Sequence, residues 1–206
     1  MGEQMRRTRA AWVIALVVIA ACTATVIGVR AYRHDDDAVS RAVNGMTGRA
    51  RPPFPVVDTT TMTASGARII ESVRAEYARN ASGTTYSGGV DEPWCADFVS
   101  TVMHESGVPL DNPNSGSWRI PGVATLTDYL HSSGRWRGPG HRPQPGDIVI
   151  YDKPSPWGQH TNIVVAVNGD EVTTVGGNQP PDGVTLHTAD LAADPGLQGF
   201  GVPAGT

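Results

Sequence analysis

The chain has 206 residues and a formal net charge of -4 at pH 7, which fits one globular domain with accessory segments. This charge excludes the large basic surface that nucleic-acid binding needs, so no nucleic-acid partner is expected. Its 24 glycines and 16 prolines indicate a loop-rich fold rather than a helical bundle, and its two cysteines allow one disulfide at most.

The N-terminal segment predicts an anchor in the lipid bilayer. Residues 10–29 carry no charge, and about 20 apolar residues suffice to cross a bilayer as a helix. Three arginines within residues 1–9 should stay cytoplasmic, so we expect a single-pass protein of the cell membrane with its bulk outside the cytoplasm. Two alternatives keep the chain outside the cytoplasm: a cleaved signal peptide, giving a secreted protein, and lipidation at Cys22 after a lipobox. In each case Cys95 has no disulfide partner.

Residues 30–63 predict an extracytoplasmic linker, because they combine an aspartate run, a Pro-Pro pair and a threonine run with little apolar periodicity. A domain is expected to follow over residues 64–206. Apolar side chains at helical spacing predict one helix over residues 65–79, with a loop after it, and a second over about 95–106. A short third helix is expected around Leu126.

After this third helix the apolar period changes from that of a helix to that of a strand. We expect short strands at residues 146–151, 161–167, 171–176 and 197–202, with a possible fifth at 184–188. Turn signals stand before the first strand and between the second and third. Helices followed by an antiparallel sheet predict an α+β domain.

Cys95 is the candidate nucleophile, because it falls in the first turn of the second expected helix. The unsatisfied N–H groups and the positive dipole end at such a position favour a thiolate and lower the pKa of a cysteine. The alternative is a small buried core residue, a common fate of free cysteines. A nucleophilic thiol needs a base, and His160 is distinguished among the six histidines because "WGQH" leads directly into the most apolar strand.

The hairpin after His160 carries a geometric prediction. If "NGD" forms a three-residue loop, Val167 pairs with Glu171 and His160 lies opposite Asn178 on the same face. A two-residue "NG" loop would shift the register by one residue and turn Asn178 to the other face. In the first register Cys95, His160 and Asn178 supply a thiol, a base and an amide, which is the arrangement of a cysteine hydrolase.

The segments "YSGG", "PWCADFVS", "PQPGDIVIYD", "QHTNIVV", "TTVGGN" and "GFGVP" follow one another between residues 64 and 203. With them, the domain resembles a CHAP domain, a cysteine, histidine-dependent amidohydrolase/peptidase of the papain-like cell-wall hydrolase group. The resemblance implies the papain-like CHAP fold, with N-terminal helices packed on a C-terminal antiparallel sheet. It implies peptidoglycan as the substrate, cleaved within the stem peptide or at its N-acetylmuramoyl-L-alanine link. It makes Cys95 the nucleophile and His160 the general base, with no cofactor and no metal.

The chain departs from this resemblance at two positions. Family members often have "HVGIV" and "EGN" where this chain has "HTNIV" and "GGN". The acidic residue that helps to hold the histidine is therefore Gly176 here, and Asn162 stands where glycine is common. In the expected register these two positions face each other. We expect the Asn162 amide to fill the space of the acid beside His160, and Asn178 to orient the imidazole.

Four residues near the proposed nucleophile and base are candidates for substrate binding. Asp97 is expected either to stabilise the helix N-terminus or to bind a substrate amine. Trp94 and Trp157 are expected either to pack in the domain or to line a sugar-binding groove, and Asn162 lies beside the base. Two other functions remain open at this point: a tethered wall-binding module without activity, and a cysteine protease or acyltransferase acting on a protein partner.

Overall fold

A computed structural model describes residues 51–180 and 183–204, and a compact unit begins at Pro52. The expected membrane segment, residues 10–29, and Cys22 lie outside the described residues. Among the helices that are described, none has the length and apolar character needed to cross a membrane.

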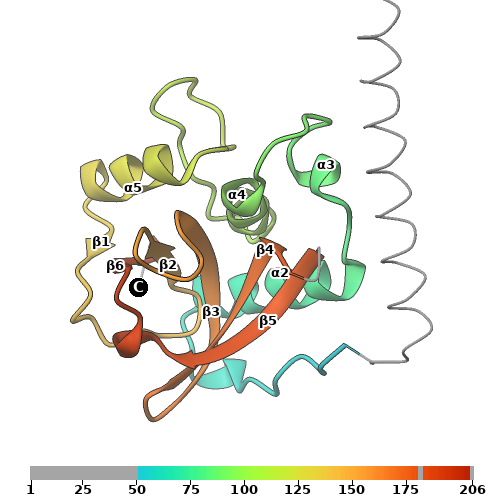
Figure 1. The fold of residues 1–206 in the computed structure, drawn as a ribbon. Coiled ribbons are helices and arrows are strands. Elements are labelled where there is room, and N and C mark those ends of the chain that lie inside the picture. Colours follow the sequence, from blue (N-terminus) through green and yellow to red (C-terminus); the bar gives the residue numbers. More distant parts are fainter. Residues whose placement is uncertain (1–50, 181–182, 205–206) are drawn as a thin grey trace, which may run out of the picture. The chain divides into compact units, whose positions relative to one another are not determined.

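The elements follow the order that the sequence pattern predicts, helices first and strands afterwards (Figure 1). The helices are η1 (Thr59–Thr61), α2 (Ala64–Arg79), α3 (Gly83–Tyr86), α4 (Cys95–Glu105), α5 (Val123–Ser132) and η2 (Leu191–Ala193). The strands are β1 (Trp136–Arg137), β2 (Ile148–Tyr151), β3 (His160–Asn168), β4 (Glu171–Gln179), β5 (Gly183–Asp190) and β6 (Leu197–Gly201). They form an antiparallel sheet in the order β1-β6-β2-β3-β4-β5, which confirms the α+β prediction.

The three predicted helices are present, and so are all five predicted strands. Helix α2 begins where the Thr63 hydroxyl accepts a hydrogen bond from the Gly66 N–H, and it ends at Asn80 in the left-handed conformation. The helix α3 lies within the segment expected as a loop, and the two-residue strand β1 was not predicted. Both are too short to carry a periodic apolar pattern.

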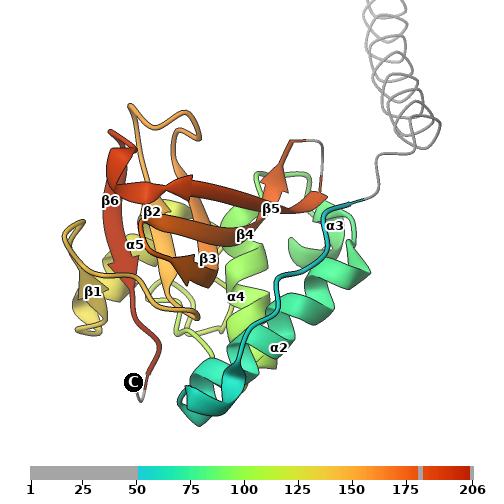
Figure 2. The same ribbon diagram turned by 90° about the horizontal axis from the view of Figure 1, so that it is seen from below.

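The compact unit begins at Pro52 rather than at Ala64, so the last part of the expected linker belongs to the domain. The Tyr77 hydroxyl donates to the Pro52 carbonyl at 2.7 Å, and the Phe54 ring packs against the Tyr77 ring at 5.9 Å. The Arg74 guanidinium lies 4.8 Å above the Phe54 ring. Figure 2 shows this segment running along α2.

The centre of the sheet, at β2 and the first part of β3, is buried on both faces, and this determines where the polar residues of β3 lie. Inward residues of β2 and β3, including Ile150 and Ile163, join the helices in the main core. The alternate residues, including Tyr151 and Val164, form a second apolar cluster on the opposite face. Side chains alternate along a strand, so His160 and Asn162 share the face of this second cluster.

The β3–β4 hairpin has a two-residue loop, because Asn168 pairs directly with Glu171. The three-residue loop that we expected is therefore wrong. A β-bulge between Val164 and Ala166 then adds one residue to β3 and shifts the register back. Towards the site, Ile163 consequently pairs with Val175, as the three-residue loop would have predicted.

Candidate active site

The start of α4 is held in place by the tryptophan before it. The Trp94 ring stacks on Tyr86 at 5.1 Å and 6°. A Cβ atom on Gly83 or on Gly177 would come within 2.3 Å of the same ring. Trp94 thus packs between α3 and β4 and fixes the position of Cys95, which follows it. Of the two roles expected for Trp94, these contacts support packing within the domain.

The Cys95 thiol is the first side chain of α4 and is 4% exposed. Burial raises its pKa, while hydrogen bonds from the backbone N–H groups of Thr161, Ala96 and Cys95 itself act in the opposite direction. We expected the helix terminus to lower this pKa. The N–H groups at the helix start do act in the expected direction, but the loss of hydration outweighs them, so the net pKa is raised. The Thr161 contact places the thiol beside the start of β3, one residue along the chain from His160.

His160 is the first residue of β3, and its imidazole is buried between aromatic rings. The Trp157 ring stacks on it at 5.5 Å and the Tyr151 ring at 6.4 Å. Burial lowers the pKa of His160 to about 4, and its Nε2 atom has no hydrogen bond of ordinary geometry among the described residues. Trp157 therefore stacks on the proposed base. This is the position in which we expected it to line a cleft.

Asn162 is fully buried and interacts with the His160 side chain. Its Nδ2 donates to Thr174 Oγ1 at 3.1 Å, and its Oδ1 accepts from Gln179 Nε2 at 3.2 Å. The amide raises the pKa of His160, although burial has the larger effect. A Cβ atom at Gly176 would lie 1.9 Å from Asn162 Oδ1. The Asn162 amide therefore occupies the space that a side chain at position 176 would need.

Asn178 forms no hydrogen bond with the imidazole, which we expected it to orient. The register of β4 with β5 shifts between Gly176 and Gln179, and Asn178 adopts the left-handed conformation with φ 59°. This turn exposes the Asn178 side chain, which forms no hydrogen bond with the buried His160. Gln179 is the buried residue instead. Gln179 was not predicted as a site residue, although the two glycines before Asn178 indicate an irregular strand at this place.

Asp97 is a structural carboxylate, and the expectation that it binds a substrate amine is not supported by its surroundings. Its side chain is fully buried and pairs with Arg119 at 2.5 Å. Arg119 also pairs with Glu92 at 3.2 Å. Burial raises the pKa of Asp97, and the Arg119 guanidinium opposes this effect. The pair joins the loop before α5 to the first turn of α4.

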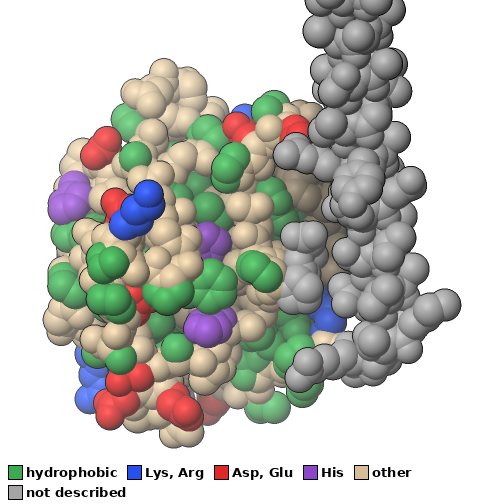
Figure 3. Space-filling model, in the orientation of Figure 1, with side chains coloured by type: hydrophobic (Ala, Val, Ile, Leu, Met, Phe, Trp, Pro, Cys, Tyr) green, Lys and Arg blue, Asp and Glu red, His purple; other side chains and the backbone are tan. Residues whose placement is uncertain are grey.

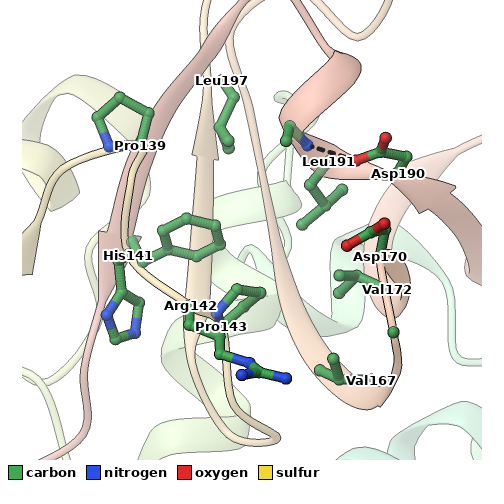
Figure 4. A pocket seen from close by; sticks show the side chains of 13 residues that line it. Pro139, His141, Arg142, Pro143, Val167, Asp170, Val172, Asp190, Leu191 and Leu197 are labelled. Carbon is green, nitrogen blue, oxygen red and sulfur yellow. Dashed lines mark hydrogen bonds between the residues drawn. The ribbon is translucent and has the colours of Figure 1, made fainter.

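Cavities open at several places on the domain. The one nearest to His160 along the chain has a volume of about 270 Å³, and Tyr151 and Gln159 line it together with residues of α5, β1 and β6. Figure 4 shows another, of about 400 Å³, with His141 and Arg142 on one side and Asp170 and Asp190 on the other. This second cavity is lined by neither Cys95 nor His160.

The surface drawn in Figure 3 carries patches of histidine near its centre, set among hydrophobic and uncharged side chains. Within the described ranges, no group of three or more His, Cys, Asp or Glu side chains is placed to hold a metal ion.

Comparison with known proteins identifies the domain. The model of the family described as CHAP domain matches residues 85–178, which include both Cys95 and His160. The crystal structure of Ly7917 is 19% identical with a TM-score of 0.44, and covers 69% of this chain and 63% of its own. The crystal structure of Ly7917 with the hydrolyzing product of MDP is 22% identical with a TM-score of 0.45, and covers 68% and 63%. This chain thus spans less than two thirds of each of these neighbours.

No curated protein matches it. At residues 85–178 the chain carries a CHAP domain, the domain of cysteine, histidine-dependent amidohydrolases/peptidases.

Proposed function

We propose that this domain hydrolyses an amide bond in peptidoglycan, with Cys95 as the nucleophile and His160 as the general base. One observation carries the assignment of these residues. Within the CHAP match, the thiol at the start of α4 lies against the backbone N–H of the residue that follows His160. The bond cleaved would be one in the stem peptide or the N-acetylmuramoyl-L-alanine link.

The burial of both groups determines the order of proton transfer. Burial raises the pKa of Cys95 and lowers that of His160, so the resting pair is a neutral thiol and a neutral imidazole. His160 therefore takes the sulfur proton while Sγ forms its bond to the amide carbonyl carbon. The imidazolium then gives this proton to the leaving amine as the C–N bond breaks. This sequence replaces the preformed ion pair that a lowered cysteine pKa would predict.

The remaining half of the reaction uses the same groups. His160 accepts a proton from water, whose oxygen attacks the thioester carbon, and the returned proton restores the Cys95 thiol as the acid leaves. The backbone N–H groups of Cys95 and Ala96, which lie near the sulfur, are the natural donors to the oxyanion. Such donors stabilise the charge that develops in the transition state.

We also propose that residues 10–29 hold the domain at the outer face of the cell membrane, close to the wall. The uncharged run of about 20 residues after three arginines supports this placement. Membrane fractionation of cells that express the chain tests it: recovery in the soluble fraction, or a mature N-terminus at Cys22, would favour the secreted or the lipid-anchored form.

The hydrolase is tested by incubating the full chain with purified peptidoglycan and identifying released fragments by mass spectrometry. We expect fragments from the wild type, whose masses name the bond, and none from Cys95→Ala. Cys22→Ala is the matched control, because it removes the other thiol and should release the same fragments. Binding without release by all three folded proteins would overturn the proposal and favour a wall-binding module. Release by Cys95→Ala would overturn the role of this thiol.

A further inference from the structure

A buried polar cluster lies behind the proposed base, on the same side of the sheet. Asn162 and Thr174 are fully buried and Gln179 is 1% exposed. These side chains come from β3 and β4 and bond to one another, with Asn162 in the middle. Buried polar groups are costly unless they are paired, so a cluster of this kind needs a reason in function or specificity.

The hydrogen-bond partners determine the orientation of the Asn162 amide, that is, which of its terminal atoms is the oxygen and which the nitrogen. The Thr174 hydroxyl donates to the carbonyl oxygen of His187, so its oxygen is left to accept from Asn162 Nδ2. On the other side, the Thr185 hydroxyl donates to Gln179 Oε1 at 2.9 Å, so Gln179 presents its Nε2 to Asn162. Asn162 Oδ1 is thereby held as an acceptor with one lone pair still free.

This free lone pair matches the unpartnered atom of the base. His160 Nε2 and the neighbouring Tyr151 hydroxyl are both buried without a hydrogen bond of ordinary geometry, and the Asn162 amide acts on the pKa of both groups, raising that of His160. An amide oxygen only accepts, so a ring nitrogen that faces it must carry the proton. With the proton on Nε2, the other nitrogen, Nδ1, is left as the acceptor for the thiol proton.

The glycine opposite Asn162 completes the arrangement. A Cβ atom at position 176 would lie 1.9 Å from Asn162 Oδ1 and 2.8 Å from its Cγ. No side chain at position 176 can coexist with Asn162 in this position. The two positions therefore compete for one space beside the imidazole, and this chain fills it from β3.

We propose that Asn162 is the positioning residue of the active site: it holds the His160 ring in the Nε2–H tautomer, in a space that either position 162 or position 176 can fill, but not both. The proposal deepens the proposed function, because it assumes that His160 is the base. Asn162 acts through His160 and does not touch the reacting atoms.

An exchange of the two side chains tests the proposal. The variants are Asn162→Gly, Gly176→Glu and the double variant N162G/G176E, measured with the wild type for kcat and KM on peptidoglycan. We expect Asn162→Gly to lower kcat about 10- to 100-fold with KM changed less than about threefold, by analogy with the loss of groups that orient a histidine. Gly176→Glu alone should be destabilised and inactive because of the clash. The double variant should regain at least about tenfold in kcat over either single variant.

A structural effect is separated by controls and by a second readout. Asn168→Gly makes the same substitution at the exposed far end of β3 and should leave kcat unchanged. Asn162→Asp keeps an acceptor and should retain most of the activity. Nitrogen NMR of labelled histidine in the Cys95→Ala chain, with His160 assigned by its loss in His160→Gln, reports the tautomer directly. The Nε2–H form should dominate with Asn162 and be lost in Asn162→Gly.

Unchanged kcat and tautomer in Asn162→Gly, or a double variant no better than the single ones, would overturn the proposal. If the wild type releases no fragments, the proposed function fails. The tautomer of His160 still decides whether Asn162 positions the ring, because that measurement needs no turnover.

Discussion

The buried imidazole of His160 should make the domain lose stability in mild acid. Burial lowers the pKa of His160 to about 4 from its ordinary value of 6.5. Between pH 6.5 and pH 4 the unfolded chain binds a proton at this histidine that the folded chain does not bind. The free energy of unfolding therefore keeps the full contribution of the neutral imidazole above about pH 6.5 and loses it as the pH falls towards 4. At about 1.4 kcal/mol per pKa unit, the full loss is about 3 kcal/mol, and most of it has occurred at pH 4.5.

Urea denaturation of the wild type and of His160→Gln, each at about pH 7.5 and pH 4.5, measures this contribution. Glutamine is polar and close in length, but it does not titrate. All other groups titrate in both proteins, so the difference between the two pH effects isolates His160. We expect the wild type to lose about 2–3 kcal/mol more than the variant. The same substitution at the exposed His131 is the matched control and should behave as the wild type does.

Two results would refute this reasoning. An equal loss in the wild type and in His160→Gln would mean that the folded state does not suppress protonation of this ring. A wild type that gains stability relative to the variant on acidification would place the pKa of His160 above its ordinary value. A raised pKa of His160 is expected if the imidazolium rests beside a Cys95 thiolate. The neutral resting pair of the proposed mechanism would then be wrong.

Three further predictions concern the surroundings of the site. Because burial raises the pKa of Cys95, its alkylation by iodoacetamide, in a chain whose other cysteine is serine, should still accelerate above about pH 8; a rate that levels off near pH 7 would contradict this. Arg119→Met leaves the buried Asp97 carboxylate without its main partner. The free energy of unfolding, measured by urea denaturation, should fall by about 3 kcal/mol at pH 7 and by less at pH 5. Equal losses at both pH values would argue against an uncompensated charge. Gly177→Ala drives a Cβ atom into the tryptophan that anchors α4 and should cost about 1–3 kcal/mol, whereas Gly138→Ala, which has open space, should cost less than about 0.5 kcal/mol by the same method.

Periodic apolar patterns predicted the elements well, because burial of one face is a local property of the sequence. Ile69, Ile70 and Val73 recur at helical spacing, and all three are fully buried in α2. The strands after residue 145 alternate or run apolar, and each forms. Pro52 and Phe54 lie outside any such pattern, and their contacts with α2 place the start of the domain earlier than the composition suggested.

The hairpin register shows how two local errors can cancel. The loop has two residues instead of three, and this alone would have turned the site residues to the wrong face. The bulge near Val164 adds one residue and restores the register at Ile163. No residue type in this stretch signals the bulge, which depends on how β3 fits against both of its neighbours. The facing of Asn162 and Gly176 was therefore predicted correctly from an incorrect loop.

The sequence by itself determined the order of elements, the α+β class, the resemblance to a CHAP domain and the placement of a lone thiol at a helix start, because each of these depends on neighbouring residues. The tertiary structure alone decided the ionisation and the partners at the site. Burial from all sides raises the pKa of Cys95 and lowers that of His160, against the local effect of the helix terminus. Asn178 itself adopts the left-handed conformation in β4, which exposes its side chain, and Asn162 is the amide that interacts with the imidazole instead. Solvation and side-chain contacts depend on segments far apart in the chain, which no local pattern contains.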